Sequence, residues 1–425
     1  MYSRTVVFRG VVIFAFTYAL IAGPRWQRFP LDRAAAALLG AVLAVGLGVL
    51  SPAAALAAID GKTLVLLFGL MGVGAFLIEG DLLLTGATRL TAWARTPQRL
   101  LGGVIWAAGG LSALITNDAV CVIFAPLVVD LVQRHRLPPL PFLLALATAA
   151  NTGSVATLVG NPQNLLCASL GGLDYRTYAF HLVPVAVMGL AFNHALLALG
   201  FRASLRAARL NPVVAFDPPA PLDPGAAAAS RTSAARTLLV LAGTVVVYLA
   251  GADLALTAVA GFVALLIIQR VDPTRFWARI DWSVLVFFAG LFIVVEAFVH
   301  AGAAAWLLAR FPIFTGADTD AYLRTSAVFL VGSNLVSNVP FILVVKNAMA
   351  VFPNPVLAWE LLAMASTFAG NLTLLGSVAN IIVAERGRAI GGLPFFAYLR
   401  VGVPLALVTT LGGTVWLLLV HGVFR

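Results

Sequence analysis

Asparagine recurs at corresponding places in the two halves of an otherwise apolar chain. Asn117 and Asn338 end the segments LITN and LVSN, and Asn164 and Asn380 end the segments TLVGNPQN and TLLGSVAN. Carboxamides donate and accept hydrogen bonds without carrying charge, so they suit a binding site for a small polar solute. Such residues can also simply join helices. That alternative is weaker for four positions that recur in both halves.

Glycine and proline inside these segments predict a break in a membrane-crossing helix. Pro162 lacks a backbone donor and Gly160 permits a tight bend, whereas the matching segment 376–380 has no proline, so we expect a gentler break there. A broken span presents a positive half-helix end to an anion and free carbonyls to a cation. The candidate binding residues are Thr116, Asn117, Asp118, Gly160, Asn161, Asn164, Ser337, Asn338, Thr373, Gly376, Ser377 and Asn380.

Three ionisable residues fall within apolar segments, where a charge costs about 2.5 to 3.5 kcal/mol on insertion scales and is a functional candidate by default. They are Asp118, Glu296 and Lys346. The sequence repeats at an offset of 221 residues, by which Asp118 corresponds to Val339 and Lys346 to Ala125, so the repeat imposes neither charge. We expect Asp118 to exchange the coupling proton and Lys346 to act as a tethered cation near the site.

Each of these assignments has a structural alternative. Lys346 could extend toward the membrane surface, and Glu296 could form a structural ion pair, while Glu360, near the outer end of its span, is expected in solvent. Cys121 and Cys167 lie close in sequence to the asparagines and could be soft ligands for trivalent arsenic or antimony, but cysteine is also a common apolar filler. No cofactor or resident metal is predicted. Three histidines show no metal-ligand spacing: His181, His194 and His300.

The composition indicates which kind of secondary structure must position these residues. The chain has 425 residues, of which 61% are hydrophobic and 10% charged, and its mean hydropathy is +1.00. These values exclude a soluble enzyme and a disordered chain. At about 20 residues per crossing, ~10 to 12 transmembrane helices fit. The net charge of +10 indicates membrane topology rather than a nucleic-acid partner, and two cysteines fit neither a disulfide framework nor a zinc cluster.

The internal repeat predicts two halves, 1–210 and 236–425, joined by a proline-rich cytoplasmic linker at 211–235. In each half we expect five crossing helices, one of them broken, and one re-entrant hairpin, at 100–133 and 323–351. The fold class is therefore an all-α polytopic membrane protein with two inverted repeats, and the first apolar segment is a retained helix rather than a signal peptide. The expected crossing segments are 6–23, 33–50, 62–79, 141–170, 177–201, 237–251, 254–270, 282–300, 356–384 and 394–421.

The distribution of basic residues orients this arrangement. With hairpins that do not cross, 19 of the 27 Lys and Arg residues fall on the face that holds the linker and eight on the other. The positive-inside rule makes the richer face cytoplasmic. We expect a multi-pass protein of the cell inner membrane with both termini periplasmic, the first hairpin entering from the cytoplasm and the second from the periplasm. If both hairpins crossed the membrane completely, Arg386 and Arg388 would be separated from the other cytoplasmic arginines.

The segments around the asparagines resemble paired signatures of the ion transporter superfamily. They are ALITNDAVCVIFAPLV, NTGSVATLVGNPQNLL, SNLVSNVPFILVV and GNLTLLGSVANIIV. Within the superfamily they resemble the group that holds arsenite and antimonite permeases, NhaD-type sodium/proton antiporters and related anion permeases, with dicarboxylate and citrate carriers more distant. The resemblance covers nearly the whole chain. It implies an elevator-type carrier in which hairpin tips and broken helices form one central site, working as a homodimer.

The expected function is efflux of arsenite or antimonite, as the neutral trihydroxide, in exchange for protons. The tip at 116–118 carries an acid where the carboxylate carriers have Ser-Asn-Thr, and an acid would repel a dianion. The alternative is a sodium- or proton-coupled permease for a carboxylate or inorganic anion, which the positive charge of Lys346 favours; a channel is a remote third. No GxxxxGK[ST] loop is present, so transport uses an ion gradient or a separate ATPase subunit. An intramembrane enzyme is disfavoured because no Ser/His pair, HExxH motif or aspartate pair has suitable spacing.

Overall fold

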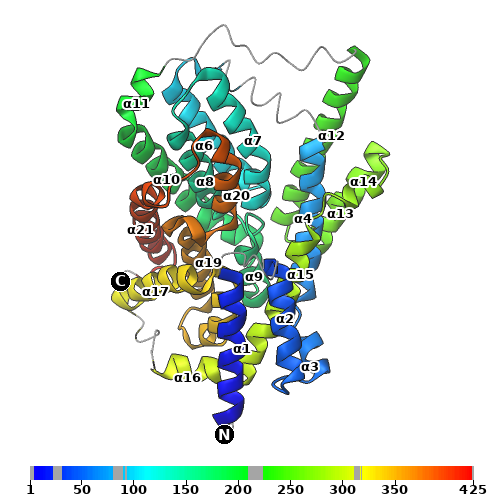
Figure 1. Cartoon of the computed structure of the whole chain (residues 1–425), viewed down its shortest axis with the longest axis vertical. Helices are drawn as coiled ribbons and strands as arrows, with labels where there is room; N and C mark the ends of the chain where they lie inside the picture. Colours follow the sequence, from blue (N-terminus) through cyan, green and yellow to red (C-terminus); the bar gives the residue numbers. More distant parts are fainter. Residues whose placement is uncertain are drawn as a thin grey trace.

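The computed structural model is helical throughout the part of the chain that it describes (Figure 1). The described residues are 4–22, 31–79, 90, 93–208, 224–310, 316 and 318–423. Among these described residues, four helices are long and apolar enough to cross a membrane: Tyr175–Gly200, Thr232–Leu249, Trp282–His300 and Phe395–Val420. Five apolar helices are shorter: Thr5–Ile21, Arg33–Gly46, Gly61–Leu77, Leu254–Gln269 and Asn338–Val351. Large apolar side chains cover the outer surface, as contact with lipid tails requires; Phe180 is 75% exposed.

The first half of the chain contains a helix-turn-helix pair and a helix interrupted near its middle, which we name the hairpin and the broken span. The hairpin consists of α6 and α7, and the broken span consists of α8 and α9. In order, the elements are α1 (Arg4–Ala22), α2 (Arg33–Gly46), α3 (Pro52–Ala57), α4 (Gly61–Glu79), α6 (Pro97–Ser112), α7 (Asn117–His135), α8 (Pro139–Ser154), α9 (Pro162–Gly171), α10 (Tyr175–Gly200) and α11 (Arg202–Ala207).

The second half repeats this order, with α17 and α18 as the hairpin and α19 and α20 as the broken span. Its elements are α12 (Pro224–Leu249), α13 (Leu254–Gln269), α14 (Thr274–Trp277), α15 (Trp282–His300), α16 (Ala303–Arg310), α17 (Thr319–Val336), α18 (Asn338–Val345), α19 (Pro355–Leu372), α20 (Val378–Arg386) and α21 (Phe395–Val420). Short 3-10 helices at Lys346–Val351, Leu374–Gly376 and Gly387–Ile390 follow α18, α19 and α20.

The linker differs from the sequence expectation at its C-terminal end. Helix α12 was expected from residue 237 but begins at Pro224, the last of five prolines in this stretch. Proline is favourable in the first turn of a helix, where its missing donor has no partner to lose. The linker is therefore shorter than the expected 211–235, because its C-terminal part belongs to α12. The rest of it, 211–223, lies outside the described residues.

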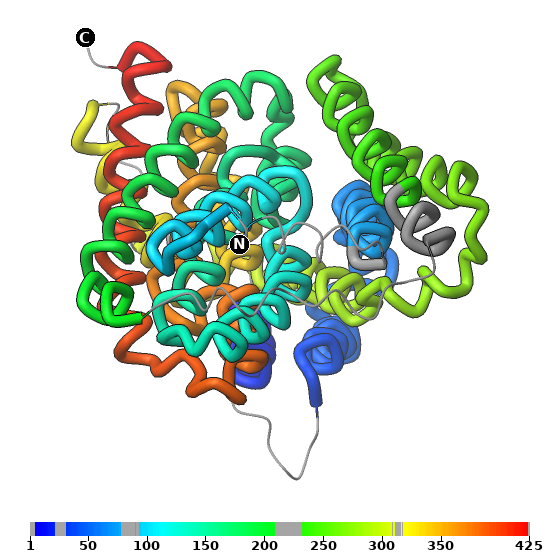
Figure 2. Tube along the Cα trace, turned by 90° about the horizontal axis from the view of Figure 1, so that it is seen from above, coloured from blue at the N-terminus to red at the C-terminus, as the bar shows by residue number. Residues whose placement is uncertain are grey.

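The helices form two groups, and each group draws on both halves of the chain (Figures 1 and 2). The flanking group contains α1–α4 and α12–α15, in which α2 packs on α15 and α4 on α13. The hairpin group contains α6–α10 and α17–α21, in which α6 packs on α8 and α19 on α21. Among the contacts that join the two groups are those of α18 with α15 and of α9 with α4. Figure 2 shows α12 and α13 standing to one side of the hairpin group.

Glycines at matching positions allow the flanking helices to approach closely. A Cβ atom on Gly69 would lie 2.7 Å from the carbonyl carbon of Ala258, and one on Gly290 would lie 2.8 Å from that of Ala37. Small residues at such crossings let helix backbones touch. Gly69 and Gly290 are 221 residues apart, as are Ala37 and Ala258. The α4–α13 and α2–α15 crossings are therefore the same contact made twice.

Candidate functional site

The two broken spans meet inside the hairpin group, and both are interrupted completely. The first break covers 155–161, between α8 and α9, and the second covers 373–377, between α19 and α20. Thr373 and Ser377 both have extended backbones, so the second break is shorter but not the gentler bend expected from its lack of proline. Pro162 starts α9 rather than ending α8, a position where proline is well tolerated.

Glycine is required in each break because other groups lie too close for a side chain. A Cβ atom on Gly160 would collide with the carbonyl of Ser154. One on Gly376 would lie 2.5 Å from the Nδ2 of Asn334 and 2.8 Å from the carbonyl oxygen of Ala369. The two glycines thus permit the turn of chain to fold back on the helix that precedes it.

Asn164 and Asn380 stabilise the two breaks in the same way. The Nδ2 of Asn164 donates to the carbonyls of Ser154 and Thr157, both at 3.0 Å. The Nδ2 of Asn380 donates to the carbonyls of Gly370 and Thr373, at 2.7 and 3.2 Å. In each half, one carboxamide therefore satisfies carbonyls that the interrupted helix leaves without intrahelical partners.

The same two asparagines also connect the halves to each other. The Oδ1 of Asn380 accepts from the Nδ2 of Asn151 at 2.9 Å, and the Oδ1 of Asn164 accepts from the Oγ1 of Thr367 at 2.9 Å. Asn151 and Thr367 are 216 residues apart, the offset that also separates Asn164 from Asn380. The network continues from Ser377 to Asn151 and from Asn161 to Thr367, both at 3.0 Å.

Asn151 is the centre of this network. Its Oδ1 accepts from the Nδ2 of Asn117 at 2.9 Å and from the Oγ of Ser377, and its Nδ2 donates to the Oδ1 atoms of Asn371, at 3.1 Å, and Asn380. The carboxamide is thereby fully satisfied. The sequence offers Asn151 as a neutral donor and acceptor near the site, but Thr367 was not among the candidates, although the 216-residue offset pairs the two.

The two hairpin tips differ in how they meet the network. At the first tip, the backbone N–H of Asn117 donates to the carbonyl of Gly160 at 2.9 Å, in addition to the side-chain bond to Asn151. At the second tip, the Oδ1 of Asn338 is buried without a hydrogen-bond partner among the described residues. Ser337 has φ 78° and ψ 149°, a conformation that few residues other than glycine adopt, whereas Thr116 has φ −66° and ψ 141°.

Asp118 lies beside the second break, as a role at the site requires. It occupies the first turn of α7, which packs on α20, and its carboxyl group faces the backbone N–H of Ala379. The two cysteines lie apart. Cys121 is buried in an apolar cluster with Ile105, and Cys167 in another with Leu166. The structure does not bring the two thiols together, and each packs as an apolar side chain.

Lys346 is part of an ion pair rather than of the asparagine network. Its Nζ lies 3.0 Å from the Oε2 of Glu296 on α15, and both side chains are about 30% exposed or less. The helical arm α18 ends at Val345, and Lys346 begins the 3-10 segment that follows. The ion pair links the second hairpin to the flanking group. The role of Lys346 as a tethered cation near the asparagines stays a prediction.

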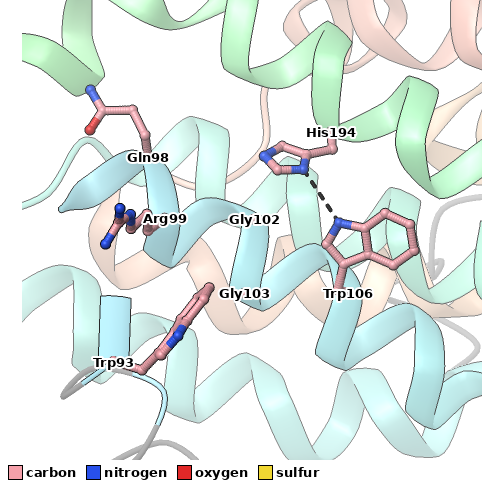
Figure 3. Close-up of a pocket in the computed structure, with 7 residues that line it drawn as sticks. All are labelled: Trp93, Gln98, Arg99, Gly102, Gly103, Trp106 and His194. Atoms are coloured by element: carbon pink, nitrogen blue, oxygen red, sulfur yellow. Dashed lines mark hydrogen bonds between the residues drawn. The ribbon is translucent and has the colours of Figure 1, made fainter. Parts of the chain in front are cut away.

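Two cavities lie outside the network. One, of about 590 Å³, is an open, mainly apolar hollow beside α6, where the Nε1 of Trp106 donates to the Nδ1 of His194 at 3.3 Å (Figure 3). Trp93 closes another side of it, and both tryptophans are well exposed, as is typical of aromatic residues at a membrane interface. The second, of about 310 Å³, lies between the two helix groups and is bordered by Lys62 and Asp174.

Comparison with known proteins identifies the family. Residues 16–369 match the model of the family described as "CitMHS: Citrate transporter". The chain is 32% identical to the "Silicon efflux transporter LSI3" of Oryza sativa subsp. japonica, over 96% of this chain and 97% of that protein. It is 26% identical to the "Putative transporter arsB" of Dictyostelium discoideum, over 91% and 87% of the two chains.

A solved structure supports the fold. The crystal structure of the Alcanivorax borkumensis YdaH transporter matches with a TM-score of 0.56 and 17% identity, covering 99% of this chain and 98% of that one. The resemblance to the ion transporter superfamily is thus confirmed, although the matching family model is that of the citrate carriers, which we expected to be more distant. An all-helical membrane protein with this family match and these relatives is a secondary transporter, and the chain belongs to the citrate transporter family of the ion transporter superfamily.

Proposed function

We propose that this protein exports arsenite or antimonite, as the neutral trihydroxide, in exchange for protons. The observation that carries the proposal is the network centred on Asn151, in which the described hydrogen bonds join carboxamides, hydroxyls and backbone groups. A neutral oxyacid with several hydroxyls can replace such bonds one for one, because each hydroxyl both donates and accepts. The names of two relatives, a silicon efflux transporter and a putative arsB, point to substrates of the same neutral or weakly acidic kind.

The charge at the site favours a neutral substrate over a dianion. Asp118 lies beside the second break, and the basic side chain closest in sequence to a tip, Lys346, is already paired with Glu296. A carboxylate dianion brought to this place would lose its hydration and meet an acid rather than a base, which is unfavourable. A neutral trihydroxide has no such cost, so Asp118 remains available to carry the exchanged proton.

The repeated contacts support an elevator mechanism with two inverted repeats. In this mechanism the hairpin group moves as the carrier and the flanking group stays as the scaffold, which also forms the homodimer contact. The two groups are each built from both halves and have repeated contacts of their own, at Gly69 and Gly290 in one and at Asn164 and Asn380 in the other. The ion pair of Lys346 with Glu296 joins the carrier to the scaffold. During movement this ion pair would have to break, or the two side chains would have to move so as to keep it.

The orientation in the membrane follows from the charges. We infer that the linker is cytoplasmic, that both termini are periplasmic and that the protein resides in the cell inner membrane. In Figure 1, α11 and the start of α12, which flank the linker, lie at the upper end of the molecule and the N-terminus lies at the lower end. A cytoplasm-specific reporter fused at the C-terminus should be silent, and an active fusion would contradict the two non-crossing hairpins.

A second candidate function is uptake of a carboxylate or inorganic anion coupled to sodium. The observation that favours it is the Oδ1 of Asn338, which is buried, has no partner in the part of the chain that the structure describes, and could coordinate a cation. The family description as a citrate transporter points the same way.

Flux measurements separate the two functions. Purified protein in proteoliposomes is offered arsenite, antimonite, silicic acid, citrate, succinate and sulfate under separate proton and sodium gradients. We expect saturable arsenite or antimonite flux that follows the proton gradient and no citrate or succinate flux. Saturable citrate or succinate uptake under a sodium gradient, without arsenite flux, would establish the second function instead.

A further inference from the structure

Three titratable side chains from three helices meet at one end of the hairpin group. The Nδ1 of His181 on α10 lies 2.9 and 3.1 Å from the two carboxylate oxygens of Glu360 on α19. The Nε2 of His421, which follows α21, lies 2.8 Å from the Oε2 of the same carboxylate. The three ligand atoms all lie within 4.8 Å of one another.

Burial makes this cluster unlike a surface ion pair. The Glu360 side chain is 1% exposed, and those of His181 and His421 are 13% and 11% exposed. A carboxylate removed from water needs compensating charge or hydrogen bonds. The expectation that Glu360 lies in solvent is therefore wrong. Of the three histidines considered from the sequence, His181 alone belongs to the cluster, together with His421. The sequence does not reveal the cluster, because Glu360 is 179 residues from His181 and 61 from His421.

We propose that His181, Glu360 and His421 form a binding site for a divalent transition-metal ion such as Zn²⁺. Two imidazoles and one carboxylate are a common donor set for zinc and related ions, with metal–ligand distances of about 2.0 to 2.2 Å. Residual exposure of both histidines leaves room for a water molecule as a fourth ligand. The ion would balance the charge of the buried Glu360 carboxylate.

Metal binding requires one change in the surroundings of His421. The Nδ1 of His421 lies 3.1 Å from the Nδ2 of Asn354, whose Oδ1 accepts from the backbone N–H of Leu357 and so caps α19. In this arrangement Nδ1 accepts a hydrogen bond and Nε2 carries the proton that points at Glu360. A metal ion on Nε2 moves that proton to Nδ1. The carboxamide of Asn354 must then turn to accept it.

This requirement singles out the substitution Asn354→Asp. The carboxylate that it introduces would accept from the Nδ1–H of His421 with one oxygen and cap α19 with the other, because aspartate is as good a helix cap as asparagine. Outer-shell acceptors of this kind typically change metal affinity by 10- to 100-fold. The substitution should therefore strengthen metal binding by about tenfold, an effect that a purely hydrogen-bonded cluster would not produce.

The position of the site assigns it a role in the carrier. It joins α10, from the first half, to α19 and α21, from the second, beside a bond from the Nε1 of Trp416 to the carbonyl of His181 at 2.9 Å. Helix α19 runs from this cluster to the second break and carries Thr367 on the way. A bound ion would fix the start of the helix whose other end forms the network. This role does not depend on which solute is carried.

The test is direct metal binding to the full-length protein, purified without a histidine tag and stripped with a chelator. Titration with Zn²⁺ by calorimetry, and with Co²⁺ by its visible absorption, should show one equivalent bound at micromolar concentration or below and a raised Tm. Glu360→Gln and His421→Gln should each weaken binding by at least tenfold. The matched control His194→Gln, which removes a histidine bonded to Trp106 outside the cluster, should bind as the unaltered protein does.

The other results are also decisive. If neither ion binds at 50 µM or below, or if Glu360→Gln and His421→Gln bind with unchanged affinity, the site is a hydrogen-bonded contact and the proposal is wrong. Should Glu360→Gln fail to fold, the Asn354→Asp variant decides the question, since unaltered or weaker binding in that variant contradicts the proposed coordination. Because binding is measured without any transported solute, failure here leaves the transport proposal untouched.

Discussion

Replacing Asn151 by alanine should weaken both the fold and the transport site. The change removes four buried hydrogen bonds, those to Asn117, Ser377, Asn371 and Asn380. At about 1 kcal/mol of net stability per bond, the free energy of unfolding should fall by about 4 kcal/mol, less whatever a water molecule entering the space restores. Arsenite flux should fall at least tenfold, because the carboxamide joins the first hairpin tip to the second break.

The residue at the corresponding position of the second half allows the size of this effect to be checked. Thr367 occupies the corresponding place but makes only two of these bonds, with Asn161 and Asn164. Thr367→Ala should therefore cost about 2 kcal/mol, half as much. Ser326→Ala is the control, since the buried hydroxyl of Ser326 has no hydrogen-bond partner among the residues that the structure describes. Thermal and denaturant unfolding of the purified protein measures all three. Equal stability of Asn151→Ala and Ser326→Ala would refute the reasoning.

Three further predictions concern single charges and one strained residue. Asp118→Asn should retain solute exchange but lose its dependence on the proton gradient in proteoliposomes, and undiminished proton-driven flux would exclude Asp118 as the coupling group. Lys346→Ala should slow transport because it leaves Glu296 unpaired, and the double variant Lys346→Ala/Glu296→Ala should recover part of the lost transport rate. A double variant as slow as the single one would show that the ion pair has no such role. Ser337→Gly should raise the Tm, since relieving a strained backbone is worth about 1 kcal/mol, and a lowered Tm would show that the serine conformation is not strained.

Several residues of the candidate site could be predicted because they occupy corresponding positions in the two repeats. Asn164 and Asn380 could be paired from the sequence because both the residue and its neighbours recur, and the structure gives them the same contacts. Asn151 and Thr367 occupy corresponding positions but differ in residue type, so a search for identical residues does not pair them. The physical requirement at that place is a donor aimed at the opposite asparagine, which a carboxamide and a hydroxyl both meet.

Contacts between residues far apart in the sequence were not predictable in this way. Lys346 and Glu296 are 50 residues apart, and the histidine–glutamate cluster joins three helices, so no local spacing indicates either. The helical segments themselves were predictable from apolar runs and from glycine and proline. Their ends were less so, as α12 shows, because a proline can begin a helix as well as end one.

The hairpin tips, finally, are where the repeat ceases to be symmetric. The first tip is held by two hydrogen bonds from Asn117, whereas the second has a strained Ser337 and, within the described ranges, a buried and unpaired oxygen on Asn338. Strain of this kind costs about 1 to 3 kcal/mol, and an unsatisfied buried acceptor costs a similar amount. Conformations of a protein that interconvert in function commonly differ by only a few kcal/mol. We therefore expect the second tip to open before the first during transport, because movement there can relieve the strain and supply the missing partner.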